Sequence, residues 1–317
     1  ARLTGGLHLA EASNASRTLL LDLSGMDWDE GLCDLFGVPP AVLGEVADSA
    51  GELGRTLPDL LGRSLPICGI AGDQQAATIG QACLAPGDTK ATYGTGAFVL
   101  ANMGTTIPRS AHRLLGTVLC QIGGDRQYAL EGSVFVAGSL VQWLRDSLGL
   151  ISKSSETAAL AASVADSGGV IIVPAHSGLG APHWRPQARG LISGLSFGTG
   201  KAQIVRAALE AMAHQTHDLA TAFAADGAGW KRLRIDGGMA ANDWMAQDLA
   251  DMLDIVVERP DFVETTALGA AMLAAHGAGM FSLLADAAGA MRGTLHAFSP
   301  SLDPAVREDR LRRWHAA

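Results

Sequence analysis

Apolar residues in this chain follow two different periods, and the change between them divides the sequence. Between residues 66 and 135 they form short runs separated by glycine, proline or aspartate, which predicts a succession of β-strands. The runs lie at residues 67–70, 90–93, 98–102, 115–120 and 126–130. The step Gly123-Gly124-Asp125 predicts a hairpin before the last of them.

From Val136 onward the apolar residues recur at helical spacing. Leu140, Trp143, Leu144 and Leu148 share one face of a predicted helix. Further helices are predicted at residues 157–164, 201–225, 242–253 and 266–275, with short strands at 170–173, 233–235 and 255–257. This alternation after a run of strands predicts a mixed α/β fold.

Residues 1–65 are less regular. Leu19–Leu21 predicts a short strand, and Pro39–Leu43 predicts the start of a helix because proline suits the first helical turn. The chain begins at Ala1 without an initiator methionine, so we expect a processed or partial product.

Composition narrows the class of protein. A length of 317 residues predicts about two domains of ~150 residues, and 39 glycines fit a turn-rich α/β protein. The net charge of −9 argues against a dedicated nucleic-acid binder. No run reaches the ~18 apolar residues of a membrane span. The four cysteines lack zinc-like spacing and predict reduced, buried thiols of a cytoplasmic protein.

Three glycine turns follow apolar strands and carry the candidate chemistry. The first is residues 69–77, with Asp73 and Gln74; the second is residues 91–96, with Thr95; the third is residues 233–238, ending in two glycines. Free backbone N–H groups in such turns bind phosphate. Asp73 is then a candidate base for phosphoryl transfer, and Gln74 a contact for a second hydroxyl.

Each of these motifs also has a purely structural interpretation. Asp73 could simply cap a helix that starts at Gln74. Thr95 could lie in an ordinary hairpin, and Gly238 in an ordinary β-turn-α connection opening the helix from Asn242. As functional residues, Thr95 would contact the β- and γ-phosphates, Gly238 would let a ribose or purine approach the backbone, and Asn242 would offer amide hydrogen bonds.

Three other features are assigned structural roles. Residues 21–25 resemble a strand and phosphate loop, but the acidic residues 27–30 follow and would repel phosphate. Small residues on every face of residues 266–271 predict close helix packing. Four histidines, at positions 176, 183, 214 and 217, have no acidic third ligand at convincing spacing, so we expect satisfied core or surface histidines and no metal site.

Motifs along nearly the whole chain, in order, resemble those of the FGGY carbohydrate kinases. They are residues 14–19, 72–77, 93–96 with Phe98, 131–133, Gly138, 142–146, 174–175, 178–182 with Trp184, 190–195, 203–204, 207–210, 236–238, Asn242 and 258–260. The form of residues 72–77 is similar to that of the glycerol-phosphorylating members.

The resemblance implies a fold of the actin-like ATPase type, with two ribonuclease-H-like lobes, a mixed sheet flanked by helices and nucleotide in the cleft. It implies ATP- and Mg²⁺-dependent phosphorylation of a small polyol, with glycerol 3-phosphate as the expected product. Asp73 would be the base, Gln74 and Phe98 would contact the polyol, and the ATP site would be lined by Thr95, Gly138, Gln142, Gly238 and Asn242.

The chain departs from the family pattern in two places. The Asp-x-Gly-Thr phosphate loop of the first lobe is absent, so residues 1–75 resemble the tail of that lobe and residues 76–317 the second lobe. Residues 57–64 lack the Gly/Lys/Arg-rich character of a loop that binds a sugar-bisphosphate inhibitor in some bacterial members.

Two rival interpretations remain. One is an FGGY kinase for a pentose or pentitol such as xylulose. The other is a non-catalytic, actin-like nucleotide-binding or assembly module. Assembly as a homo-oligomer also stays open.

Overall fold

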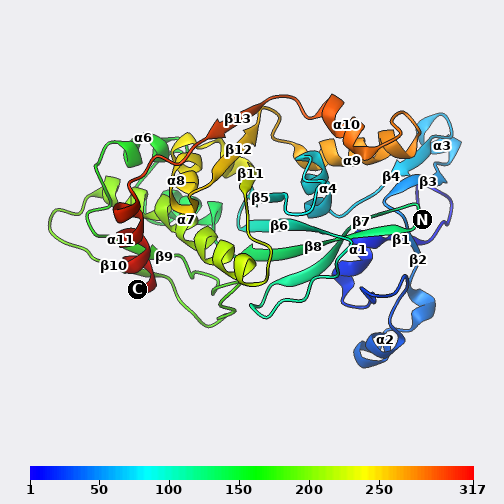
Figure 1. Cartoon of the computed structure of the whole chain (residues 1–317), viewed down its shortest axis with the longest axis horizontal. Coiled ribbons are helices and arrows are strands. Elements are labelled where there is room, and N and C mark those ends of the chain that lie inside the picture. Colours follow the sequence, from blue (N-terminus) through cyan, green and yellow to red (C-terminus); the bar gives the residue numbers. More distant parts are fainter.

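One mixed sheet of nine strands runs through the molecule, as the computed structural model of residues 1–317 shows (Figure 1). Its order from edge to edge is β13-β12-β11-β5-β6-β8-β7-β3-β4. In chain order these strands are β3 (Ala50–Arg55), β4 (Pro66–Gly69), β5 (Thr89–Tyr93), β6 (Ala97–Gly104), β7 (Leu115–Ile122), β8 (Asp125–Val134), β11 (Arg232–Asp236), β12 (Val256–Pro260) and β13 (Leu295–Phe298). Strand β11 is parallel to β5 and β12, whereas β5, β6, β8 and β7 pair antiparallel. The predicted mixed α/β sheet is confirmed.

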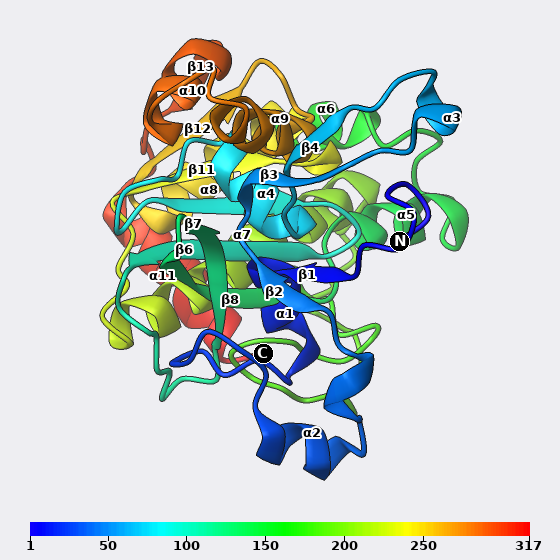
Figure 2. The same cartoon turned by 90° about the vertical axis from the view of Figure 1, so that its right-hand side faces the viewer.

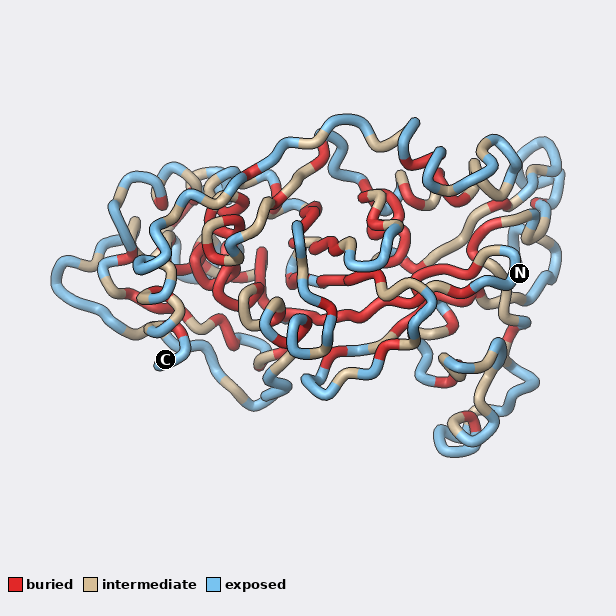
Figure 3. The backbone as a smooth tube through the Cα atoms, viewed as in Figure 1, coloured by how far each residue is buried: buried red, intermediate tan, exposed pale blue.

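Helices cover both faces of this sheet. One face carries α4 (Asp73–Gly80) and α9 (Thr265–Gly277), with α10 (Leu284–Met291) packed on α9. The other face carries α5 (Gly138–Asp146), α7 (Lys201–Ala225) and α8 (Asp243–Leu253). Figure 3 shows the buried residues concentrated in the sheet and in α7. Two separate apolar layers therefore hold the sheet between the helices.

Further elements extend the fold beyond these layers. Helix α6 (Glu156–Ala162) packs on α7 and α8, and α11 (Pro304–His315) lies near the same end of the molecule (Figure 1). Strands β9 (Ile171–Val173) and β10 (Leu191–Ser193) form a separate antiparallel ribbon. No helix has the length and apolar character needed to cross a membrane.

The first 65 residues contain more regular structure than the sequence predicts. They form β1 (Leu9–Glu11), α1 (Ala12–Ala15), the 3₁₀ turn η1 (Ser16–Thr18), α2 (Glu30–Phe36), the 3₁₀ turn η2 (Pro40–Val42), β2 (Glu45–Ala47), β3 and α3 (Pro58–Leu61). Helix α2 projects from the body of the molecule (Figure 2). Its cap is Asp29, whose Oδ1 accepts the Leu32 N–H at 2.8 Å, so this acidic stretch begins a helix.

Several sequence predictions need correction. No strand forms at residues 19–21, because Leu19 has a left-handed φ of 64° and only Leu21 makes a single bridge, to Trp28. The prolines at 39 and 40 begin one 3₁₀ turn and no longer helix. Helix α5 ends at Asp146, so Leu148 lies beyond the apolar face assigned to it and is exposed.

Other predictions are confirmed. Strands β7 and β8 form a hairpin whose connecting residues, Gly123 and Gly124, both have positive φ, 61° and 81°. Helix α7 has the predicted bounds. All four cysteines are buried and free of disulfides. The small residues of α9 allow it to pack closely on α4, where Gly269 lies against the backbone of Ala76.

Candidate active site

The second and third glycine turns lie side by side, because both follow the carboxyl ends of neighbouring parallel strands. Strand β5 ends at Tyr93 and β11 ends at Asp236. Gly237 has a φ of 86°, and a Cβ on it would lie 2.5 Å from the Tyr93 carbonyl oxygen. Glycine is thus required both by the backbone conformation and by the close approach of the two turns. Ligands of open α/β sheets bind at such strand ends.

Helix α5 begins against the turn that contains Thr95. The Gly138 N–H donates to the Gly94 carbonyl at 2.9 Å, and the Ser139 N–H donates to the Thr95 carbonyl at 3.1 Å. A Cβ on Gly138 would lie 2.5 Å from the Gly94 oxygen, so only glycine fits there. The Thr95 side chain is exposed, and its own N–H and hydroxyl make no hydrogen bond within the protein. Both groups are therefore free to meet an anion.

A cavity of about 390 Å³ opens beside the third turn. Gly238 and Asn242 line it together with Ser155 and Thr157. A Cβ on Gly238 would meet nothing within 4 Å, so the absent side chain leaves open space. The volume of the whole cavity is in the range of small-molecule pockets.

The structure shows where two of the predicted nucleotide residues, Asn242 and Gln142, lie relative to this cavity. The Asn242 amide donates to Thr157 Oγ1 at 3.0 Å, while its carbonyl oxygen accepts the Met245 N–H at 3.1 Å and caps α8. It therefore shapes the cavity wall and the helix start together. Gln142 is exposed on α5, one turn after Gly138, and does not line this cavity.

Asp73 is the first residue of α4 and is exposed. The capping position belongs to Gly72, so the interpretation of Asp73 as the N-cap is wrong. The Asp73 carboxylate instead accepts the Gln74 N–H at 2.8 Å, which holds it at the positive end of the helix. Nothing buries it, so it can reach a ligand.

The N-terminal segment holds this turn in place. The Gly72 N–H donates to Ser13 Oγ at 2.9 Å, and Ser13 Oγ donates to Glu11 Oε2 at 2.6 Å. Glu11 and Ser13 are buried. These two residues hold the Asp73 turn although they lie more than 50 residues earlier in the chain. No local motif indicates this contact.

A buried lysine on β5 links Gln74, the neighbour of Asp73, to Thr92 on the same strand. Lys90 Nζ donates to Gln74 Oε1 at 2.6 Å and to Thr92 Oγ1 at 2.7 Å. Burial lowers the pKa of Lys90, although the carboxylates of Asp236 and Glu131 oppose the shift. The sequence analysis missed this residue; a lysine within an apolar strand was the available signal.

Phe98 lies near the start of β6, opposite Thr92 in the register of the sheet. Residues paired across an antiparallel ladder share a face, so Phe98 lies on the face that carries Lys90 and Thr92. Its exposed fraction is 37%. The predicted polyol residues, Gln74 and Phe98, are thus both on the α4 side of the sheet.

Lys90→Met tests the positioning role of this lysine. We expect the KM for the acceptor substrate to rise about tenfold, the effect of one net hydrogen bond, because Gln74 loses its partner. The turnover number should change less, since Asp73 keeps its own contacts. Steady-state kinetics with varied acceptor check this, and an unchanged KM would contradict it. Lys90→Arg, which keeps a donor, should recover part of the loss.

Comparison with known proteins identifies the family of the chain. Residues 1–80 match the N-terminal domain, and residues 89–278 the C-terminal domain, of the FGGY family of carbohydrate kinases. The chain is 52% identical over 317 residues to a glycerol kinase of Rhodospirillum centenum, covering 100% of this chain and 64% of that protein. It is also 52% identical to a glycerol kinase of Rhodospirillum rubrum, covering 99% and 63%. The chain therefore spans a little under two thirds of the length of these relatives.

Solved structures give the same result. The crystal structure of Plasmodium falciparum glycerol kinase with ADP superposes with a TM-score of 0.93 at 35% identity, covering 99% of this chain and 63% of that one. A xylulose kinase from Rhodospirillum rubrum superposes with a TM-score of 0.83 at 25% identity, covering 99% and 64%. The predicted fold, of the actin-like ATPase type, is confirmed. By its matched domains, its sequence and its fold, this chain belongs to the FGGY family of carbohydrate kinases.

Proposed function

We propose that the protein transfers the γ-phosphoryl group of ATP to glycerol and forms glycerol 3-phosphate. The observation that carries the proposal is the exposed carboxylate of Asp73, held at the start of α4 and linked through Gln74 and Lys90 to the strand that ends in the Thr95 turn. The glycerol kinases at 52% identity support glycerol as the acceptor.

The residues divide the reaction between them. Asp73 accepts the proton of the acceptor hydroxyl as that oxygen attacks the γ-phosphorus, and the bond to the β–γ bridging oxygen breaks so that ADP leaves. Gln74 and Phe98 hold the polyol. The free N–H and hydroxyl of Thr95 meet the phosphates, with charge stabilisation that strengthens as the transition state forms.

The site fits a nucleotide. The open space over Gly238 leaves room for a ribose or base against the backbone, and Asn242 lines the same cavity. Gly138 lies behind it, where a Cβ would meet the Met239 side chain at 3.1 Å. Gln142, exposed on α5 outside this cavity, is proposed to contact the part of the nucleotide that extends beyond it. Mg²⁺ is usually bound by one or two carboxylates together with substrate phosphates, and it neutralises phosphate charge when bound. Asp73 at the start of α4 is an exposed carboxylate that could hold the ion, whereas Asp236 is buried and already accepts hydrogen bonds from Gln81 and Thr265.

We further propose that residues 1–75 belong to the first kinase lobe and residues 76–317 to the nucleotide-binding lobe. Lobe closure over the substrate would exclude water from the reaction. The substrate is a small polyol rather than a nucleic acid, and we propose a cytoplasmic enzyme.

Acceptor-dependent ADP release from the intact gene product tests the proposal. We expect release with glycerol and ATP, and little with xylulose or a pentitol. Faster release with xylulose would reassign the substrate within the family. Nucleotide binding without release for any acceptor would favour the non-catalytic module.

Gly238→Val tests the nucleotide wall. The added side chain enters the cavity without meeting protein atoms at its Cβ. We therefore expect the Kd for ATP to rise about tenfold or more. The free energy of unfolding should change by no more than about 0.5 kcal/mol. Equilibrium titration with a fluorescent ATP analogue measures the first, and calorimetry the second. An unchanged nucleotide affinity would place the nucleotide elsewhere.

A further inference from the structure

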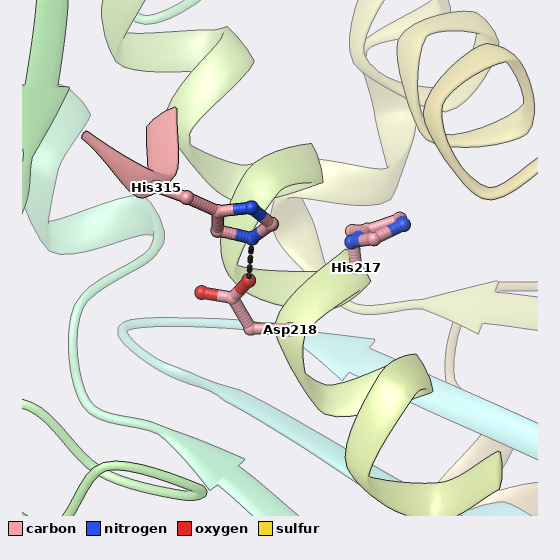
Figure 4. A group of neighbouring side chains, drawn as sticks. All are labelled: His217, Asp218 and His315. Carbon is pink, nitrogen blue, oxygen red and sulfur yellow. Dashed lines mark hydrogen bonds and ion pairs between the residues drawn. The ribbon is translucent and has the colours of Figure 1, made fainter. Parts of the chain in front are cut away.

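Three potential metal ligands converge at the far end of α7, outside the kinase site. His217 and Asp218 are neighbours on α7, and His315 is the last residue of α11 (Figure 4). One ligand atom from each lies within 4.8 Å of the other two. The spacing of the histidines alone predicts no metal site, because no acid lies at a convincing spacing from them. In the structure Asp218, which directly follows His217, lies close to His315, almost 100 residues further along the chain.

The distances suit a small cation. His315 Nε2 lies 3.2 Å from Asp218 Oδ1. Tetrahedral zinc bonds of about 2.0–2.2 Å separate neighbouring ligand atoms by roughly 3.3–3.6 Å. The Asp218–His315 spacing is close to this range, and the His217 ligand atom, within 4.8 Å of both, must move closer to join them.

One polar atom of the group has no partner. His217 Nδ1 is buried and accepts or donates no hydrogen bond within the protein. Leaving such an atom unsatisfied costs free energy, which ligation of a cation would remove. This unpaired nitrogen distinguishes the group from an ordinary hydrogen-bonded cluster.

The surrounding residues orient the ligands. Trp314 Nε1 donates to Asp218 Oδ2 at 2.9 Å, which fixes the carboxylate and leaves Oδ1 toward His315. The Trp314 ring stacks on His214 with centroids 5.1 Å apart. Such support around the ligands is typical of metal sites.

Helix α11 is itself held firmly enough to present His315. Arg310, one turn earlier, forms a two-point ion pair with Asp248 of α8, at 2.6 and 2.9 Å, and both side chains are buried. His315 thus approaches α7 on a docked helix, although its own side chain is more than half exposed.

A route for the ion and a further ligand are present. A cavity of about 530 Å³ is lined by Asp218 and His315, and also by His183 and His112. His183 Nε2 lies 3.3 Å from Asp218 Oδ2 and is a candidate fourth ligand. An ion entering this cavity from solvent reaches Asp218 and His315.

We propose that His217, Asp218 and His315 form a binding site for a transition-metal dication, Zn²⁺ by its ligand chemistry, which fastens α11 to α7. Two imidazoles and a carboxylate are a donor set that zinc uses in proteins. The site is separate from the phosphoryl-transfer residues, so its role is to stabilise the C-terminal helix rather than to act in the reaction.

Metal titration of the intact gene product tests the proposal without an activity assay. Zn²⁺ affinity is measured by competition with a chromophoric chelator, and Co²⁺ is added separately to read its visible d–d absorption. We expect one ion per chain, an intense tetrahedral-type Co²⁺ spectrum that Zn²⁺ abolishes, and a higher melting temperature with Zn²⁺. His315→Gln and His217→Gln should weaken Zn²⁺ binding at least tenfold, whereas His296→Gln, an exposed histidine on β13, should not.

Because the His315 side chain is exposed, we expect His315→Gln to fold like the parent. Circular dichroism of the metal-free variant checks this. Zn²⁺ affinity equal in the parent and in His315→Gln would overturn the proposal. A parent protein with no tetrahedral Co²⁺ spectrum would overturn the proposal as well. Asp218 would then only accept hydrogen bonds from its neighbours. Neither result bears on glycerol phosphorylation.

Discussion

Asp73→Asn is expected to lower the turnover number by about 10²–10⁴-fold, the range for loss of a general base. The amide keeps the size of the side chain, and its oxygen can still accept the Gln74 N–H that the carboxylate accepts at 2.8 Å. It cannot take the proton of the attacking hydroxyl. ATP affinity should change little, because the proposed nucleotide wall lies at the Thr95 and Gly238 turns. Acceptor-dependent ADP release and ATP titration on the same preparation measure the two effects.

Asp59→Asn is the matched control. Asp59 is also an exposed acid in the first turn of a short helix, α3, and lies in no predicted site. It should leave turnover within a few-fold of the parent. If Asp73→Asn also turns over within a few-fold, the base is another group. If the parent has no turnover while both variants bind ATP, the non-catalytic nucleotide-binding module becomes the better hypothesis.

Local sequence predicts the parts of the candidate site in which the backbone itself requires a particular residue, glycine. A side chain would clash with backbone at Gly96 and Gly237 and would enter the cavity at Gly238, so the glycines themselves mark these turns in the sequence. Asp73 follows the glycine turn at the start of α4, as predicted, but the N-cap of that helix is Gly72 and not Asp73. Its catalytic role stays a prediction.

The rest of the site depends on contacts between distant segments. Lys90 reaches Gln74 across 16 residues, and Ser13 holds Gly72 across 59. Nothing in the local pattern around Ser13 distinguishes it from an ordinary helix-start serine. The metal-ligand group shows the same limit, because Asp218 was visible beside His217 but His315 joins them only when α11 docks.

The N-terminal 65 residues were the least predictable part of the fold for a related reason. Strand β3 joins the rest of the large sheet through a single register pair with β7, Ala50 with Ile122, and holds β4 at the outer edge. Its sequence, residues 50–55, contains two glycines and two charged residues and has little strand character of its own. Tertiary pairing therefore decides its conformation against weak local propensity.

Gly269→Ala should destabilise the fold by about 3 kcal/mol or more, at or beyond the upper end of ordinary overpacking. A Cβ on Gly269 would lie 1.8 Å from the Ala76 carbonyl oxygen and 2.8 Å from the Gly80 nitrogen. From the α4 side, a Cβ on Gly80 would likewise lie 2.0 Å from the Thr265 carbonyl oxygen of α9. The obstructing atoms are backbone, so no side-chain rotation relieves the clash, and α4 must move away from α9. Denaturant unfolding measures the loss.

The same substitution at Gly289 is the matched control, with the opposite expected sign. Gly289 lies within α10, is exposed, and a Cβ there would meet nothing within 4 Å. Alanine should therefore stabilise the fold by about 0.5–1 kcal/mol through helix propensity alone. Equal effects at the two positions would contradict the close crossing of α4 and α9. Because α4 begins at Asp73, any folded Gly269→Ala protein should also lose turnover, since a displacement of about 1 Å in a catalytic group can cost ~10²-fold.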